Sequence, residues 1–160
     1  MSNNDIWKWS AKETANAVKN KMISATDSIK SSLKRLDEVN SNVNAVVVSL
    51  KEEALNKAQQ IDKKIKNNET LGSLAGVPIT IKENVDVRNQ STTNGMKVFK
   101  DIIAPQNSPV VQNLIDEDGI IIGRTNTPEI SYRWFTDNPL RGLTKNPWSE
   151  DITPGGSSGG

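Results

Sequence analysis

Two parts of the sequence carry residue types that could act together in catalysis. One is Lys82, and the other is the segment Pro154–Gly160, which reads Pro-Gly-Gly-Ser-Ser-Gly-Gly. Glycine allows backbone conformations and close approaches that other residues forbid, and serine hydroxyls both donate and accept hydrogen bonds. A rigid turn with two hydroxyls among free N–H groups suits an anion or an acyl group. The alternative interpretation is a flexible Gly/Ser-rich linker or a cloning remnant.

Lys82 directly follows the apolar run Val77–Ile81 and also has two interpretations. It could cap the end of a strand in water. It could instead be partly buried, where a lowered pKa would make the neutral amine available as a base. A free lysine, with a pKa of about 10.4, is almost wholly protonated at neutral pH, so a base role requires a shift of several units. Serine–lysine pairs are a known way to activate a serine without histidine.

The absence of cysteine and histidine narrows the chemistry. It excludes a thiolate nucleophile, a Ser-His-Asp triad and an HExxH metal helix within these residues. The sequence also has no GxGxxG or Gly-Lys-Ser/Thr pattern, so we expect no cofactor and no phosphate cradle. Five carboxylates could be considered as metal ligands, but they lie on unlike predicted elements, so we expect solvated or capping groups and no metal site. They are Glu83, Asp86, Asp116, Glu117 and Asp118.

Composition argues against nucleic acid and membrane partners. The 160 residues include 20 Lys and Arg against 19 Asp and Glu, so there is no basic field to attract nucleic acid. No apolar run approaches the length of a transmembrane helix, and the polar start of the chain lacks a signal-peptide pattern. These features predict a soluble, cytoplasmic protein that contacts neither nucleic acid nor membrane directly.

The elements that must position Lys82 and the serine turn follow from local patterns. Ser10 with Glu13, and Ser24 with Asp27, are typical of helix starts, and runs of β-branched residues indicate strands. The alternation of strands and helices predicts an α/β fold with a largely parallel or mixed sheet. The expected helices cover residues 10–21, 24–40, 51–67, 109–118 and, as a short helix, 128–133, and the expected strands cover 44–50, 77–81 and 119–123.

Four segments, in order, resemble the amidase signature family. Gly76–Asp86 is similar to its lysine segment, and Ile122–Glu129 is similar to its Gly-Lys-Thr-Asn-x-Pro-Glu segment. Gly142–Trp148 and Pro154–Gly160 are similar to the start of its Gly/Ser-rich signature, which removes the linker interpretation. The resemblance implies a mixed-sheet core flanked by helices, truncated here after the Gly/Ser-rich turn. Residues 1–160 would be the N-terminal part of a single domain, with 1–70 a helical lead-in containing one strand and 71–160 the start of the signature core.

The resemblance also implies a Ser–cis-Ser–Lys relay that cleaves a carboxamide C–N bond. The family lysine falls on Lys82 and the bridging serine on Ser157, with a cis peptide bond before it. The nucleophilic serine and its oxyanion hole would lie beyond residue 160, so we expect the 160 residues alone to be inactive. The residues expected to shape the site are Ser158, Gly155, Gly156, Gly159 and Gly160.

Three functions remain open on the sequence. The first is an amidase acting on a small-molecule amide. The second is the A subunit of an aspartyl/glutamyl-tRNA amidotransferase, which would release ammonia from glutamine for partner subunits; the segment Tyr132–Leu140 resembles general amidases more closely. The third is an inactive truncated fragment that acts only as a scaffold. A homodimer also stays open, and the sequence does not name the amide.

Overall fold

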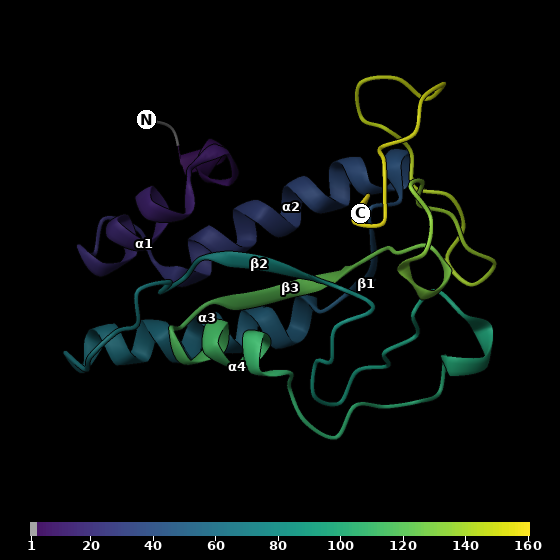
Figure 1. The fold of residues 1–160 in the computed structure, drawn as a ribbon. Coiled ribbons are helices and arrows are strands. Elements are labelled where there is room, and N and C mark those ends of the chain that lie inside the picture. The colour runs from purple at the N-terminus through teal and green to yellow at the C-terminus, as the bar shows by residue number, and fades with distance from the viewer. Residues whose placement is uncertain (1–2) are drawn as a thin grey trace. The chain divides into compact units, whose positions relative to one another are not determined.

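The computed structural model describes residues 3–160, and its elements follow the order expected from the sequence (Figure 1). Each expected strand and long helix is present with small shifts at its ends. The helices are α1 (Ala11–Lys19), α2 (Ala25–Val43), α3 (Lys51–Lys66) and α4 (Pro109–Asp116), and the strands are β1 (Val46–Ser49), β2 (Pro78–Lys82) and β3 (Ile120–Thr125). Short 3-10 turns are η1 (Asn3–Lys8), η2 (Lys97–Phe99) and η3 (Glu129–Ser131).

The short helix expected at 128–133 is only the 3-10 turn η3. Its interruption has a backbone cause, because Ile130 and Ser131 have φ values of 52° and 56°. These are left-handed conformations, which a right-handed helix cannot contain. Local pattern does not reveal this interruption, since a β-branched isoleucine rarely adopts positive φ.

The three strands form a mixed sheet, as expected, and their order in it is β1-β3-β2. Strands β1 and β3 pair antiparallel, with Val46 opposite Thr125 and a register shift between Val46 and Val48. Ile120 N–H donates to the Val77 carbonyl at 2.9 Å, and Glu83 N–H donates to the Thr125 carbonyl at 3.0 Å. Residue numbers rise together along these two contacts, so β2 runs parallel to β3. Lys82 therefore ends a strand that is fixed to the central strand.

The helix starts confirm the capping signals. Ser10 Oγ accepts from Glu13 N–H at 3.2 Å, while Glu13 Oε2 accepts from Ser10 N–H at 2.7 Å. This reciprocal pair satisfies N–H groups that have no partner within the helix. The first turn of α2 is also fixed from α3, because the Asp62 carboxylate accepts from the Ala25 and Thr26 N–H groups at 2.7 and 3.1 Å.

The chain divides into two compact units with different interiors. The first comprises the described residues up to Glu38, Leu50–Ile79 and Gln112–Ile122, and the second comprises Val39–Ser49, Thr80–Val111 and Gly123–Gly160. Apolar side chains from α1, α2, α3 and β3 form the core of the first unit. In the second unit many of the buried side chains are polar, and they include Glu83, Thr93, Arg124, Asn126, Thr127, Thr136, Asn138 and Thr144. Buried polar groups require hydrogen-bond partners, so the second unit depends on directional contacts.

The expectation of solvated carboxylates is wrong for Glu83 and Asp118, which are 0% and 2% exposed. Asp118 accepts hydrogen bonds from Lys64 Nζ at 2.8 Å and from Gly72 N–H at 2.9 Å. Burial raises the pKa of Asp118, but these bonds from Gly72 and Lys64 outweigh it and leave the pKa below its ordinary value. Both partners are distant in sequence, so the pattern around Asp118 could not reveal them.

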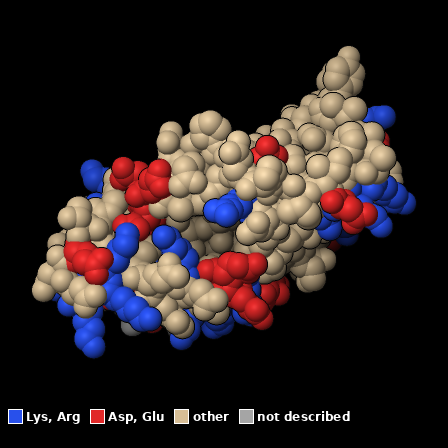
Figure 2. All heavy atoms as spheres, turned by 90° about the horizontal axis from the view of Figure 1, so that it is seen from below, with Lys and Arg blue, Asp and Glu red and all other residues tan. Residues whose placement is uncertain are grey.

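Surface charge follows the balanced composition. On the face shown in Figure 2, basic and acidic side chains are intermingled. Among residues 3–160, no helix combines the length and apolar character needed to cross a bilayer.

Candidate active site around Lys82 and Ser157

The structure brings the two sequence-predicted groups into direct contact. Lys82 Nζ, at the end of β2, lies 2.8 Å from Ser157 Oγ and 3.2 Å from Ser158 Oγ. Lys82 and Ser157 are 75 residues apart in sequence, and both belong to the second unit. The ammonium donates to both hydroxyls. An amine hydrogen-bonded to a serine hydroxyl is the arrangement needed for proton transfer between them.

The surroundings of Lys82 change its acidity in the direction that a base requires. The side chain is half-buried, and this burial lowers the pKa of Lys82 below its ordinary value of 10.5. Removing water from an ammonium disfavours its charged form. The neutral amine is therefore more accessible here than on a lysine in free solution.

The turn that carries Ser157 has an unusual backbone. The Gly156–Ser157 peptide bond is cis, as predicted, and Gly155 has a φ of 94°. Positive φ is readily adopted by glycine and strained for other residues. Thr136 Oγ1 donates to the Gly155 carbonyl at 3.1 Å, which fixes the turn against a buried residue of the same unit.

Three glycines of this turn lie against the chain's own atoms. One is Gly160, where an added Cβ would come within 2.5 Å of the Asn126 backbone nitrogen. A Cβ added at Gly156 would come within 2.6 Å of the Arg133 carbonyl oxygen, and one at Gly159 would overlap the Thr136 hydroxyl. Side chains at Gly156 and Gly159 would therefore push the turn away from the segment 133–136. The close approach that requires glycine is here an internal one, and contact of these glycines with substrate stays a prediction.

Glu83, the neighbour of Lys82, is fixed by an ion pair that the sequence did not predict. Its carboxylate accepts from Arg141 Nη2 at 2.6 Å, from Arg141 Nε at 3.2 Å and from Thr93 Oγ1 at 3.0 Å. Bonds of this charge-assisted, two-point kind are among the stronger side-chain contacts. Arg141 lies 58 residues further along the chain in a loop without periodic pattern, so no local signal could have identified it.

Asparagines fix the loops around the turn. Asn138 Nδ2 donates to Asn126 Oδ1 and to the Thr127 carbonyl, both at 2.7 Å. Asn126 Nδ2 in turn donates to the Gly142 carbonyl at 3.0 Å and to Thr144 Oγ1 at 2.9 Å. Both asparagines are buried. The asparagine of the Arg-Thr-Asn-Thr-Pro-Glu segment therefore has a structural role next to β3.

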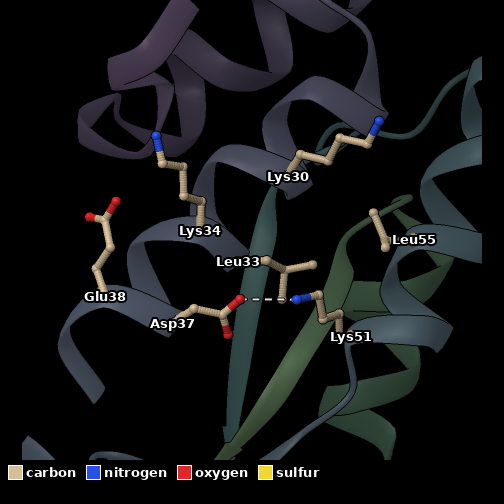
Figure 3. A pocket seen from close by; sticks show the side chains of 7 residues that line it. All are labelled: Lys30, Leu33, Lys34, Asp37, Glu38, Lys51 and Leu55. Atoms are coloured by element: carbon tan, nitrogen blue, oxygen red, sulfur yellow. Dashed lines mark hydrogen bonds and ion pairs between the residues drawn. The ribbon is translucent and has the colours of Figure 1, made fainter. Parts of the chain in front are cut away.

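The first unit contains a separate cavity, lined by charged and apolar side chains. This cavity of about 520 Å³ is lined by residues of α2 and α3 (Figure 3). Across it, Lys51 Nζ lies 2.9 Å from the Asp37 carboxylate, with both side chains more than half exposed. An exposed ion pair of this kind contributes little to the stability of the fold. None of the residues that line the cavity is a serine that could act as a nucleophile. The lining residues are Lys30, Leu33, Lys34, Asp37, Glu38, Lys51 and Leu55.

Among residues 3–160, no three His, Cys, Asp or Glu side chains gather closely enough to hold a metal ion. Lys82, Ser157 and Ser158 form a cluster whose hydrogen bonds are suited to proton transfer.

The chain was compared with protein-family models and with known proteins, and both comparisons found similar sequences. A family model described as Amidase matches residues 27–160. An indoleacetamide hydrolase of Bradyrhizobium diazoefficiens is 54% identical over 155 residues, covering 97% of this chain and 30% of that protein. The A subunit of a glutamyl-tRNA(Gln) amidotransferase from Clostridium acetobutylicum is 38% identical over 98% of this chain and 32% of its own length.

A solved structure agrees with these sequences. A bacterial aryl acylamidase of the amidase signature family superimposes with a TM-score of 0.90 at 33% identity, covering 94% of this chain and 32% of that one. The chain spans about a third of the length of the relatives it matches. The family model covers well over half of the 160 residues, and the fold agrees with that of a family member. The chain belongs to the amidase signature family.

Proposed function

We propose that the full-length protein carrying these residues is an amidase that hydrolyses a carboxamide C–N bond. The observation that carries the proposal is the 2.8 Å contact between Lys82 Nζ and Ser157 Oγ, made by an amine whose pKa is lowered by burial. In this proposal residues 1–160 are the N-terminal part of a single amidase domain, with a helical lead-in over 1–70 and the start of the core over 71–160.

The proposed steps balance protons and bonds. Neutral Lys82 takes a proton from Ser157, and Ser157 takes one from a nucleophilic serine outside these 160 residues. That serine attacks the amide carbonyl, the C–N bond breaks, and the relay returns the proton to the departing ammonia or amine. Water then adds to the acyl ester, giving the carboxylic acid and the free serine. Ser158 would hold the ammonium of Lys82 while the relay is protonated.

The similarity to an indoleacetamide hydrolase, at 54% identity, supports a specific substrate class. We propose an arylacetamide with a primary carboxamide, which would yield the arylacetic acid and ammonia. The similarity to an aryl acylamidase also supports an amide that carries an aromatic group.

Ammonia release from indole-3-acetamide by the full-length protein tests the proposal. Lys82→Met and Ser157→Ala should each lower kcat by about a hundredfold or more, because general acid–base groups contribute on this scale. Lys97→Met is the matched control, since Lys97 is an exposed lysine of the same unit and its loss should leave kcat unchanged. Full activity in the Lys82→Met protein would overturn the proposed mechanism.

The isolated 160-residue chain gives a second test. Because the proposed nucleophile lies outside it, this chain should show no amide hydrolysis above background. Turnover by the isolated chain that disappears in Lys82→Met would instead indicate that Ser157 or Ser158 is itself the nucleophile.

The 38% identity to the A subunit of an amidotransferase favours one alternative function. In that case the same serine–lysine relay would release ammonia from glutamine for transfer by partner subunits. Purified full-length protein should then hydrolyse glutamine only with those partners and should leave indole-3-acetamide intact. Hydrolysis of indole-3-acetamide without any partner would exclude this alternative.

A further inference from the structure

Arg124 has an unusual set of partners for a buried cation. It lies on the central strand β3, is 1% exposed, and is one of the largest fully buried side chains of the described residues. Its guanidinium donates to four backbone carbonyls, which belong to Ile81, Lys82, Val85 and Ser91. The distances are 3.3 Å from Nε to Ile81, 3.2 and 2.7 Å from Nη2 to Lys82 and Val85, and 3.3 Å from Nη1 to Ser91.

These carbonyls surround the end of β2 that carries the proposed base. The chain from Ile81 to Ser91 bends around the guanidinium, so one side chain fixes the residue before Lys82, Lys82 itself and the turn after it. A lysine has three donors on one atom, whereas arginine has five on a planar fork. The five N–H donors of the arginine guanidinium can therefore reach four carbonyl oxygens that lie in different directions, whereas the three donors of a lysine cannot.

Both polar groups of the Lys82–Glu83 peptide unit are fixed from β3. Its carbonyl accepts from Arg124 Nη2 at 3.2 Å, and its N–H donates to the Thr125 carbonyl at 3.0 Å. A peptide unit held at both ends cannot rotate about the chain direction. The Cα–Cβ bond of Lys82, and with it the direction of the amine, is therefore set by two consecutive residues of β3.

We propose that Arg124 is a positioning residue for Lys82, which aims the amine at Ser157 by holding the backbone on both sides of it. The inference rests on the amidase mechanism proposed above. Arg124 touches neither the hydroxyls nor any reacting atom in this proposal, and it acts only through the carbonyls that it binds.

The charge of Arg124 is compatible with this position. Burial lowers the pKa of Arg124 below its ordinary value, while the Glu83 and Asp86 carboxylates raise it and Arg141 adds to the lowering. An arginine stays protonated in proteins. Hydrogen bonds from a charged donor are shorter and stronger than neutral ones, so this cation can hold four neutral carbonyls in place.

Losing these contacts should affect the acidity of Lys82 as well as its aim. With its backbone released, the amine would move toward water and lose the burial that lowers its pKa. The pKa would then rise toward 10.5. Since only the neutral amine accepts a proton, the rising limb of the kcat–pH profile should move to higher pH in the variant. A residue needed only for stability would lower the yield of folded enzyme without moving this limb.

The test compares Arg124→Met and Arg124→Lys with Arg88→Met in the full-length protein. Arg88 is an exposed arginine of the same unit, so it controls for the loss of one cation. We expect kcat on indole-3-acetamide to fall by about tenfold to a hundredfold in Arg124→Met, the scale on which small misplacements act. KM should stay nearly unchanged, Arg124→Lys should fall between wild type and Arg124→Met, and Arg88→Met should match wild type.

A second readout does not depend on amide turnover. Competitive acetylation of Lys82 by acetic anhydride across pH, quantified by mass spectrometry, measures the pKa of its amine directly. We expect the labelling midpoint of Lys82 to move to higher pH in both Arg124 variants and to stay in place in Arg88→Met. If Arg124→Met does not fold, by circular dichroism, Arg124→Lys decides the question on the same measurements.

The two proposals fail in different ways. The positioning role is overturned if a folded Arg124 variant keeps the kcat, the rising limb of the kcat–pH profile and the Lys82 labelling midpoint of wild type. The proposed function would survive that result as long as Lys82→Met abolishes turnover. A wild-type protein that hydrolyses no amide would overturn the proposed function, and the labelling midpoint of Lys82 would still show whether Arg124 controls the lysine.

Discussion

The ion pair between Glu83 and Arg141 allows a quantitative test of how the site is held. Glu83 is fully buried and accepts three hydrogen bonds, two from Arg141 and one from Thr93. Glu83→Gln keeps the shape of the side chain but removes its charge and replaces one acceptor oxygen by an amide donor. That donor then faces another donor, either Arg141 Nε or Nη2.

Breaking a buried ion pair from one side typically costs about 3–5 kcal/mol, because the other charge is left without its partner. The Arg141 side chain is 24% exposed, so water can replace part of the lost contact. We therefore expect the lower end, a loss of about 3 kcal/mol in the free energy of unfolding. Urea denaturation followed by far-UV circular dichroism at neutral pH measures this loss.

The chain offers a control ion pair with the same shortest distance and different burial. Glu150 and Lys145 form an ion pair at 2.6 Å, the same distance as the shortest Glu83–Arg141 contact, but their side chains are 70% and 40% exposed. Glu150→Gln should cost less than about 1 kcal/mol, as exposed pairs do. Equal losses in Glu83→Gln and Glu150→Gln would refute the argument that burial, and not distance, decides the value of the contact.

Three further predictions concern single positions. Lys82 has a lowered pKa in the folded state, so between that pKa and 10.5 the unfolded chain binds more protons than the folded one. In urea titrations, the stability of wild type relative to Lys82→Met should therefore increase as pH rises through this window. An increase as pH falls would contradict the lowered pKa. Asp118→Asn should lose about 1.5–3 kcal/mol at neutral pH, since the bonds from Lys64 and Gly72 involve a charged acceptor. This loss should shrink as pH falls below 3.8 through the lowered pKa of Asp118, and a pH-independent loss would argue against the ion pair. Ile130→Gly should raise the free energy of unfolding by about 1 kcal/mol, because Ile130 has a φ of 52° and is 63% exposed; a lower thermal midpoint would show that its packing matters more.

Local signals in the sequence are sufficient for the strands, the long helices and the central pair of the candidate site. Capping residues such as Ser10 and β-branched runs such as Ile120–Ile122 act within a few residues, so they can be recognised without the fold. Lys82 and Ser157 can be identified because they occur in recognisable segments, and their separation of 75 residues does not matter.

The residues that hold the site could not be predicted in this way. Arg141 pairs with Glu83 across 58 residues, and a loop arginine with no periodic surroundings looks like a solvated charge. Arg124 binds backbone carbonyls, which every residue possesses, so its partners leave no trace in side-chain identity. The same reason explains why sequence reasoning places Glu83 on the surface, since its burial depends on partners that only the folded chain supplies.

The two units also show why a site of this kind is built from polar contacts. Apolar burial, which dominates the first unit, stabilises without fixing direction. The proton transfer that we propose between Lys82 and Ser157 is sensitive to misplacements of about 1 Å, and hydrogen bonds can hold both side chains in position. Arg124 binds the Lys82 carbonyl, through which we propose that it positions the amine, and Thr136 binds the Gly155 carbonyl in the turn of Ser157. The contact at 2.8 Å is therefore the result of two independently fixed segments, and removing the fixation of either one should separate the pair while leaving the apolar core of the first unit intact.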